Sequence, residues 1–148
     1  MTNYNCDGVG SIALIATIPE GTSVNERIGK KCRYKSIQVR GNMQGNANAI
    51  LNDCAVLIVY DRRPRGALPA ITDILVSVSA SSFNNDAFSG RFQIVRRYDF
   101  TLVGDNSGTN LTEKSSIDCS DFIKFQGQLV CGAAGTGAIN DIEQGALY

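Results

Sequence analysis

Ala55-Val-Leu-Ile-Val-Tyr-Asp-Arg-Arg-Pro64 is the stretch around which the rest of this chain is organised. An unbroken apolar run that is rich in β-branched residues and ends at proline is typical of a strand buried on both of its faces. Asp61, Arg62 and Arg63 follow the run at once, and Arg65 comes just beyond them. One element is therefore predicted to supply both the centre of a sheet and a positively charged corner.

The remaining strands are predicted from alternation of apolar and polar residues. Besides the opening strand, expected over residues 50–62, the pattern appears in residues 12–18, 32–43, 91–103 and 117–131. In the stretch 32–43 the apolar phase changes near Lys35-Ser36, which predicts a β-bulge. In 91–103 one face is expected to hold Phe92, Ile94, Tyr98, Phe100 and Leu102. Turns are expected at residues 45–48 and 105–110, and a last apolar piece at 145–148.

One short helix is expected after the basic corner. Pro69 suits a first helical position, and Ile71, Ile74, Leu75 and Val78 follow at helical spacing. Strands of about ten residues without βαβ alternation predict an antiparallel sandwich or barrel. At 148 residues, with no linker, the chain is expected to form a single domain over residues 1–148.

The composition gives no support for an enzyme. Histidine is absent, the acids lie singly in turns, and the glycine-rich string 132–137 lacks the spacing of a phosphate loop. The five cysteines (Cys6, Cys32, Cys54, Cys119 and Cys131) have no CxxC spacing and are interpreted as small hydrophobic residues. Asn110-Leu-Thr112 matches a glycosylation sequon by pattern alone. We expect no cofactor, no metal, no small-molecule substrate and no membrane association.

Charge is distributed unevenly along a chain whose net charge is zero. Between residues 27 and 65 nine basic residues face two acids, whereas residues 105–148 carry six acids and two lysines. Such segregation is expected of a protein that binds a polyanion, and equally of copies of one protein that dock positive to negative. The charge pattern leaves both interpretations open.

Nucleic acid is the polyanion that the basic strand fits best. The candidate binding residues are Arg27, Lys30, Lys31, Arg33, Lys35 and Arg40. With the bulge, Arg33, Lys35 and Arg40 fall on one exposed face. Neutralising about five phosphates of a single strand would give log affinity a slope near −3.5 against log salt. A solvated face with salt bridges between subunits is the alternative, and the few aromatic residues expected beside these cations favour it.

The paired arginines Arg96 and Arg97 in mid-strand are expected to be contact residues rather than DNA ligands. An arginine on an apolar face needs an acidic partner, and Asp99 or Asp61 on neighbouring strands are the candidates. A buried or interfacial ion pair is therefore predicted here.

Four segments of the chain resemble coat proteins of small circular single-stranded DNA viruses, in particular geminiviruses. Gly21-Thr-Ser-Val-Asn-Glu-Arg-Ile-Gly-Lys-Lys31 with Tyr34-Lys-Ser-Ile37 is similar to the family's "GT…N-x-R-I/V-G-(K/R)-(K/R)…K-S-I/V". Val59-Tyr-Asp-Arg-Arg-Pro64 resembles "V-x-D-R-R-P", and Arg91-Phe-Gln-Ile-Val-Arg-Arg97 resembles "R-Y-Q-V-L-R-(R/K)". Glu143-Gln-Gly-Ala-Leu-Tyr148 is similar to "T-E-N-A-L-x-L-Y". The segments occur in the family's order.

The resemblance implies an all-β, antiparallel jelly-roll sandwich whose copies assemble into an icosahedral shell around single-stranded DNA. It implies a place in the virion and in the host cell nucleus during assembly. Family members normally begin with an Arg/Lys-rich arm and continue past the Ala146-Leu-Tyr148 position with a further apolar strand pair. The chain is therefore expected to be either a divergent relative or a trimmed version without both ends, and a sandwich edge is expected to be open.

Two functions follow from the resemblance. The first is a self-assembling shell protein, in which Asp61, Arg62, Arg63, Arg65, Arg96 and Arg97 are the candidate contact residues. The second is a non-assembling carrier of single-stranded nucleic acid, similar to the geminivirus nuclear shuttle and movement proteins. Because Asp61 sits beside the corner arginines, we expect Arg62 and Arg63 to serve local pairing or subunit contact more than DNA binding.

Overall fold

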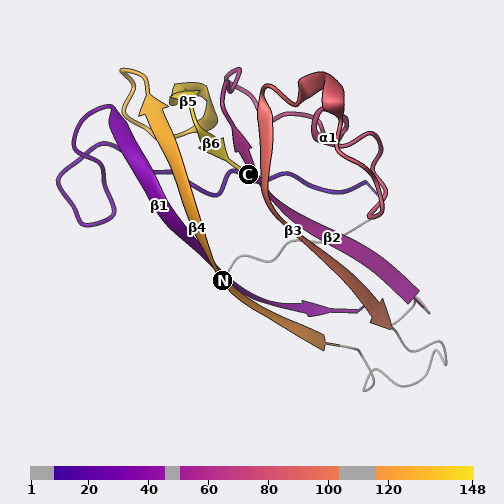
Figure 1. Ribbon diagram of the computed structural model, residues 1–148. Helices are drawn as coiled ribbons and strands as arrows, with labels where there is room; N and C mark the ends of the chain where they lie inside the picture. The colour runs from indigo at the N-terminus through magenta and orange to yellow at the C-terminus, as the bar shows by residue number, and fades with distance from the viewer. Residues whose placement is uncertain (1–8, 46–50, 104–115) are drawn as a thin grey trace.

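The computed structural model describes residues 9–45, 51–103 and 116–148, which form two antiparallel sheets (Figure 1). The first sheet has the order β1-β4-β5 and the second the order β3-β2-β6. The strands are β1 (Lys31–Gln44), β2 (Leu51–Asp61), β3 (Phe92–Val103), β4 (Ser116–Cys131), β5 (Ile142–Gln144) and β6 (Ala146–Leu147). The predicted all-β antiparallel sandwich is confirmed, and the arrangement fits a jelly roll.

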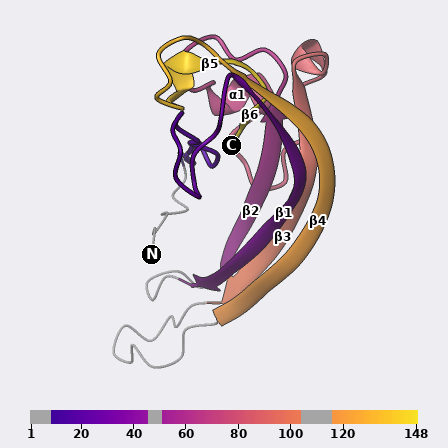
Figure 2. The same ribbon diagram turned by 90° about the vertical axis from the view of Figure 1, so that its left-hand side faces the viewer.

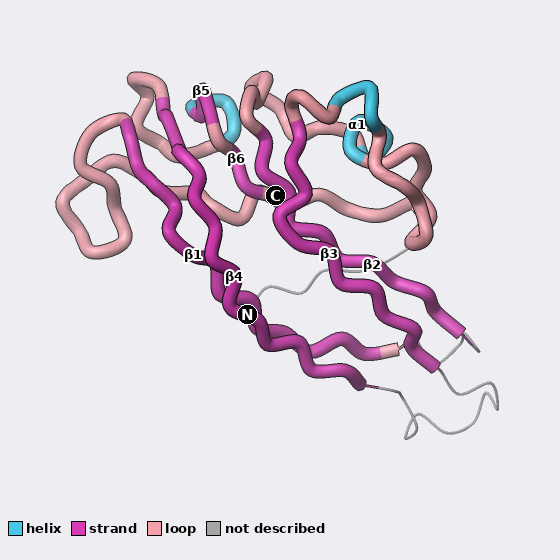
Figure 3. Tube along the Cα trace, viewed as in Figure 1, coloured by secondary structure: helices cyan, strands magenta, loops and turns pink. Residues whose placement is uncertain are grey.

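The helical content is small and lies with most of the described loops at one end of the long strands (Figure 3). It consists of α1 (Ile71–Ile74) and two 3₁₀ turns, η1 (Asp86–Phe88) and η2 (Ile139–Asp141). As predicted, the helix is short. The carboxylate of Asp73 accepts a hydrogen bond of 3.0 Å from the backbone N–H of Ala70 at its start. Val78, which the helical spacing included, lies beyond the last turn.

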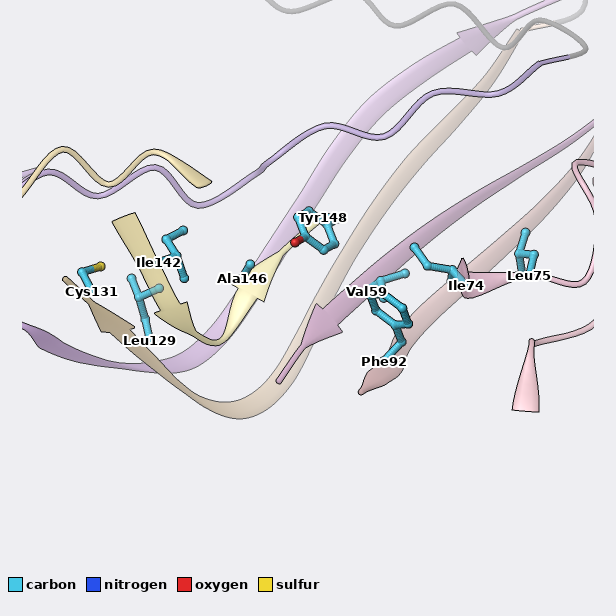
Figure 4. Packing of buried hydrophobic residues seen from close by; sticks show 9 residues of the cluster. All are labelled: Val59, Ile74, Leu75, Phe92, Leu129, Cys131, Ile142, Ala146 and Tyr148. Carbon is cyan, nitrogen blue, oxygen red and sulfur yellow. The ribbon is translucent and has the colours of Figure 1, made fainter. Parts of the chain in front are cut away.

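Strand β2 is buried on both faces in its C-terminal half, as the opening stretch predicts. Ile58 and Tyr60 point into a cluster with Phe125 of β4, which lies between the two sheets. Val59, on the opposite face, belongs to a larger cluster that extends to α1 and to β3. Figure 4 shows this second cluster running from Cys131 and the neighbouring strands through Tyr148 to α1.

The stretch 12–18 forms no strand, and that prediction is wrong. The chain is extended here, and its hydrogen bond to a strand backbone joins the Ile15 N–H to the Leu147 carbonyl at 2.8 Å. The alternation nevertheless marks the face correctly, since Ile12, Leu14 and Ile18 pack against the core cluster. Alternation reports which side of an extended segment is buried, and it carries no information about a hydrogen-bonded neighbour.

Register shifts occur in both sheets. The shift between Tyr34 and Ser36 in β1 confirms the predicted bulge. A second shift, between Ile58 and Val59, leaves Val95 of β3 as the additional residue. It changes the phase of β3, so that Phe92 packs in the cluster that contains Val59, whereas Val95 and Tyr98 pack between the sheets. The prediction that one face runs unbroken along β3 is therefore wrong.

Gly145 carries the chain from the first sheet to the second. Its φ of +80° is a left-handed conformation that favours glycine, and a Cβ there would collide with the carbonyl of Gln128. The Tyr60 hydroxyl donates to that carbonyl at 2.8 Å, and the Tyr34 hydroxyl donates to the Gly145 carbonyl at 3.2 Å. Hydrogen bonds from one buried tyrosine, Tyr60, and one half-buried tyrosine, Tyr34, thus hold the chain where it crosses between the sheets.

The four long strands, two from each sheet, curve together, as Figure 2 shows. None of the helices in the described ranges is long and apolar enough to cross a membrane. Cys32, Cys119 and Cys131 are free thiols. Cys6, the predicted turn at 105–110, most of the turn at 45–48 and the sequon at 110–112 lie outside the described residues.

Candidate nucleic-acid interface and contact surfaces

The outer face of the β1–β4 pair carries a group of exposed cations that we call the basic face. Residues directly opposite each other on antiparallel strands share a face. Ser36 pairs with Lys124, Gln38 with Phe122, and Arg40 with Ser120. The basic face comprises Arg33, Lys35, Arg40 and Lys124, all of which are exposed. Lys30 and Lys31 are exposed beside it, at the start of β1.

One aromatic ring lies within the basic face. Phe122 is 59% exposed and is flanked on β4 by Ser120 and Lys124. Neither Phe122 nor Lys124 was among the residues predicted for this face. The signal was present, because Ile123, Phe125 and Leu129 share the buried phase of β4, so that residues 122 and 124 must point the other way.

Arg27 does not lie on the basic face. Its side chain is fully buried, and its guanidinium donates to the carbonyls of Ile18, at 3.1 Å from Nε, and of Gly29. It also pairs with Glu20 at 3.3 Å and lies 3.6 Å from the buried carboxylate of Asp141. Arg27 therefore holds the loop before β1 in place, and the prediction that it contacts phosphate is wrong because its side chain is buried.

The basic corner at the end of β2 is organised around a buried carboxylate. Asp61 is 0% exposed and receives Nη2 of Arg91 at 2.7 Å and Nε at 3.0 Å. The Tyr148 hydroxyl donates to it at 3.1 Å and the backbone N–H of Arg63 at 2.9 Å. The hydrogen bond to Asp61 raises the pKa of Arg91, and burial followed by the charge of Asp61 raises the pKa of Tyr148.

Because Asp61 is buried, it is not available for contact with a neighbouring subunit, and its ion-pair partner is an arginine that was not predicted. The charge partner of Asp61 is Arg91, which precedes β3, and not the side chains next to it. Arg62, Arg63 and Arg65 are exposed at the corner, and Arg62 donates to the side chain of Gln93 at 3.1 Å. The corner therefore presents three exposed arginine side chains, none of which forms an ion pair with Asp61.

The two mid-strand arginines each have an acidic partner. Arg97 pairs with Asp99 of its own strand at 2.8 Å, in an exposed ion pair and not the predicted buried or interfacial one, and also donates to the carbonyls of Ser82, at 2.7 Å, and Ala80. It thereby ties the loop after α1 to β3. Arg96 pairs instead with Asp121 of β4 at 2.8 Å, so Asp61 is not its partner.

The Arg96 pair links the two sheets through a shared carboxylate. The Tyr98 hydroxyl also donates to Asp121, at 3.0 Å. This hydrogen bond and the contact with Arg96 hold the pKa of Asp121 below its ordinary value. The cluster therefore links β3 of one sheet to β4 of the other at the surface.

Two loops present apolar side chains to solvent. In the loop before β1, Val24 and Ile28 are 100% and 88% exposed. In the loop after α1, Val76 is exposed and Phe83 is 83% exposed. The two loops lie on opposite sides of the molecule in Figure 1. A half-open groove of about 670 Å³ beside the second loop is lined mainly by apolar residues, among them Ile12, Leu57 and Ile71.

The described residues contain no cluster of acidic or cysteine side chains with the geometry of a metal site. Asp141, which follows the glycine-rich string 132–137, accepts the backbone N–H groups of Ala134 at 3.1 Å and Gly137 at 3.2 Å. The string therefore wraps a carboxylate of its own chain, which occupies the amide groups that a phosphate loop would present.

The sequence is similar to a known protein family and to capsid proteins of two plant viruses. The sequence model of the Geminivirus coat protein/nuclear export factor BR1 family matches residues 2–148. The capsid protein of Tomato yellow leaf curl Sardinia virus is 27% identical over 108 residues, which cover 67% of this chain and 42% of the relative. That of Bean golden yellow mosaic virus (isolate Puerto Rico) is 26% identical over 115 residues, covering 72% and 46%. The chain thus spans less than half the length of these relatives.

Proposed function

The chain belongs to the Geminivirus coat protein/nuclear export factor BR1 family, and from this premise we propose that it is a viral capsid protein. Copies of the chain assemble into an icosahedral shell that encloses single-stranded DNA, and the protein is a component of the virion. Its role is structural and not enzymatic. The observation that carries the proposal is the family match, which extends over the whole described sandwich.

The two apolar loops support self-assembly. Exposed apolar side chains gathered in a loop are a common feature of protein–protein contact sites. Val24 and Ile28 on one side of the molecule, and Phe83 with the neighbouring groove on the other, are two different patches. Contacts between unlike patches produce head-to-tail arrays, which close into rings or shells when the rotation between copies allows it.

The basic face supports the nucleic-acid part of the proposal. Its cations stand on the solvent-exposed outer face of a strand pair, a surface along which a single strand can lie with its phosphates near Arg33, Lys35 and Arg40. Single-stranded DNA is thus the second partner of the protein, besides further copies of itself. Assembly in the host cell nucleus belongs to the same proposal.

A second candidate function is a non-assembling carrier of single-stranded nucleic acid. The family description also names a nuclear export factor, and such a carrier would use the same basic face without the apolar loops. The two functions therefore differ in whether the exposed side chains of Val24 and Ile28 are needed for contacts between copies of the protein.

Size-exclusion chromatography with negative-stain electron microscopy of the full chain, with and without single-stranded DNA, separates them. We expect shells, and we expect Val24→Ser with Ile28→Ser to abolish the shells while leaving the monomer folded, because both side chains are exposed. Thr22→Ala with Asn25→Ala, in the same exposed loop, is the matched control and leaves assembly intact. Small oligomers alone, at every salt concentration and pH, would overturn the capsid proposal in favour of the carrier.

A further inference from the structure

We infer that Phe122 is a base-stacking residue of the basic face, on which an unpaired nucleobase of single-stranded DNA lies while Arg40 and Lys124 hold the flanking phosphates. This inference rests on the proposed binding of single-stranded DNA and adds to it a specific contact. Among the described residues of the outer β1–β4 face, Phe122 is the one aromatic side chain.

The position of Phe122 is fixed by the register of the two strands. It lies directly opposite Gln38, so that Arg40 and Ser36 are its diagonal neighbours on β1. On its own strand, Lys124 lies two residues away, roughly 7 Å along β4. The ring is therefore bordered by a cation on each strand, within the reach of their long side chains.

Gln38 orients one of these cations. When the side-chain amide oxygen of Gln38 faces Arg40, it accepts hydrogen bonds of 3.1 Å from both Nε and Nη2 of that arginine. The remaining guanidinium nitrogen, Nη1, is then left for a phosphate. Arg40 is thus a preorganised anion contact next to the ring, which lowers the entropy lost on binding.

The surroundings of Phe122 favour a nucleic acid over a second protein. Its neighbours on the face are serine, glutamine and cations, and no apolar side chain extends the ring into a hydrophobic patch. The one acid on the outer face of the described β1–β4 pair is Asp118, which accepts a hydrogen bond of 2.6 Å from Asn42. An isolated ring among uncompensated cations matches the combination of stacking and phosphate contacts that single strands require. In the loops that contain Val24 and Phe83, by contrast, a further exposed apolar side chain lies nearby in the sequence, as is expected of a protein contact.

The direct test measures the affinity of the full chain for a fluorescein-labelled oligonucleotide of twenty thymidines across a range of salt concentrations. Replacing a stacking aromatic residue by alanine costs about 1–3 kcal/mol per base, so Phe122→Ala should bind roughly 5- to 150-fold more weakly. Because a ring carries no charge, the slope of log affinity against log salt should not change. Arg40→Ala, in contrast, should reduce the magnitude of that slope by about 0.7.

Three further variants complete the test. Phe122→Trp should retain or improve binding, Phe122→Leu should lose it while keeping the apolar bulk, and Phe83→Ala, an exposed phenylalanine on a distant loop, should bind as the wild type does. Unchanged affinity of Phe122→Ala and Phe122→Leu, with salt-dependent binding by the wild type, would overturn the inference and leave the proposed function in place. If the Phe122→Ala variant forms no shells but binds the oligonucleotide with wild-type affinity, the inference is also overturned, and Phe122 is a subunit contact. Absence of any wild-type binding would overturn the DNA-binding proposal itself.

Discussion

The guanidinium of Arg91 binds the fully buried carboxylate of Asp61, with Nη2 2.7 Å from Oδ2 and Nε 3.0 Å from Oδ1. The two residues are thirty positions apart in the chain and meet because β2 and β3 pair with Asp61 opposite Phe92. The Tyr148 hydroxyl donates to the same carboxylate. One ion pair therefore fixes three segments at the end of the sandwich from which the basic corner extends.

Arg91→Ala should strongly destabilise the fold. It leaves the charge of Asp61 buried without a partner, which typically costs about 3–5 kcal/mol in the free energy of unfolding. Urea unfolding followed by far-UV circular dichroism measures this. Arg62→Ala, which removes an exposed arginine next to the same carboxylate, is the control and should change stability by about 0.5 kcal/mol or less. Equal, small effects of both substitutions would contradict the assigned role of the pair.

Stability should fall as the pH rises above about 10, where unfolded tyrosines lose their protons. Burial raises the pKa of Tyr34 and of Tyr148, so both hydroxyls stay protonated in the folded protein after they ionise in the unfolded chain. The unfolded state then binds fewer protons, and the free energy of unfolding decreases with pH.

The alkaline loss can be assigned with Tyr34→Phe. This variant lacks the hydrogen bond to the Gly145 carbonyl and should be less stable than the wild type at pH 8 by about 1 kcal/mol. Between pH 10 and 11 it should lose less stability than the wild type, since one of the protonated hydroxyls is gone. A parallel decline of both proteins in urea titrations over this range would exclude Tyr34 as a source of the effect.

Arg97→Ala should release the loop after α1 without unfolding the sandwich. The side chain donates to the carbonyls of Ala80 and Ser82, and these two bonds and the pair with Asp99 are lost together. Hydrogen exchange measured by mass spectrometry should become faster in residues 76–83 and stay unchanged in β2. Arg96→Ala, which breaks the cross-sheet contact with Asp121, should leave exchange in this loop as in the wild type.

Arg62→Ala combined with Arg63→Ala should impair assembly more than DNA binding. Both side chains are exposed at the end of β2 and neither belongs to the basic face, and the carboxylate next to them in sequence, Asp61, is already bound to Arg91. These cations are therefore open to an acidic surface of a neighbouring copy. Particle yield by electron microscopy, compared with oligonucleotide affinity, decides the matter. A larger loss of affinity than of particles would return the corner arginines to a DNA-binding role.

Local pattern in the sequence was enough to predict the double burial of β2 and the bulge in β1. Both are properties of one strand, read from the order of its own apolar residues. The segment 12–18 shows the limit of this reading, because its alternation was correct and its predicted strand was not. Whether an extended segment becomes a hydrogen-bonded strand depends on which segment lies beside it, and the sequence of the segment itself does not contain that information.

The candidate sites show the same division. The exposure of Arg33, Lys35 and Arg40 followed from the strand phase, and that of Phe122 could have been read from the phase of β4. The burial of Arg27 and the choice of Arg91 as the partner of Asp61 depend on how distant segments meet. A carboxylate after an apolar run signals that some cation must reach it, but the register decides which of the nearby arginines does so.

The most direct test of the capsid function is nuclease protection of circular single-stranded DNA assembled with the full chain. The mixture is treated with nuclease, sedimented through a density gradient and imaged by electron microscopy. We predict intact DNA in the fractions that contain closed shells of uniform size. Complete digestion of the DNA, with only small oligomers in every fraction at all salt concentrations and pH values, would contradict the proposal.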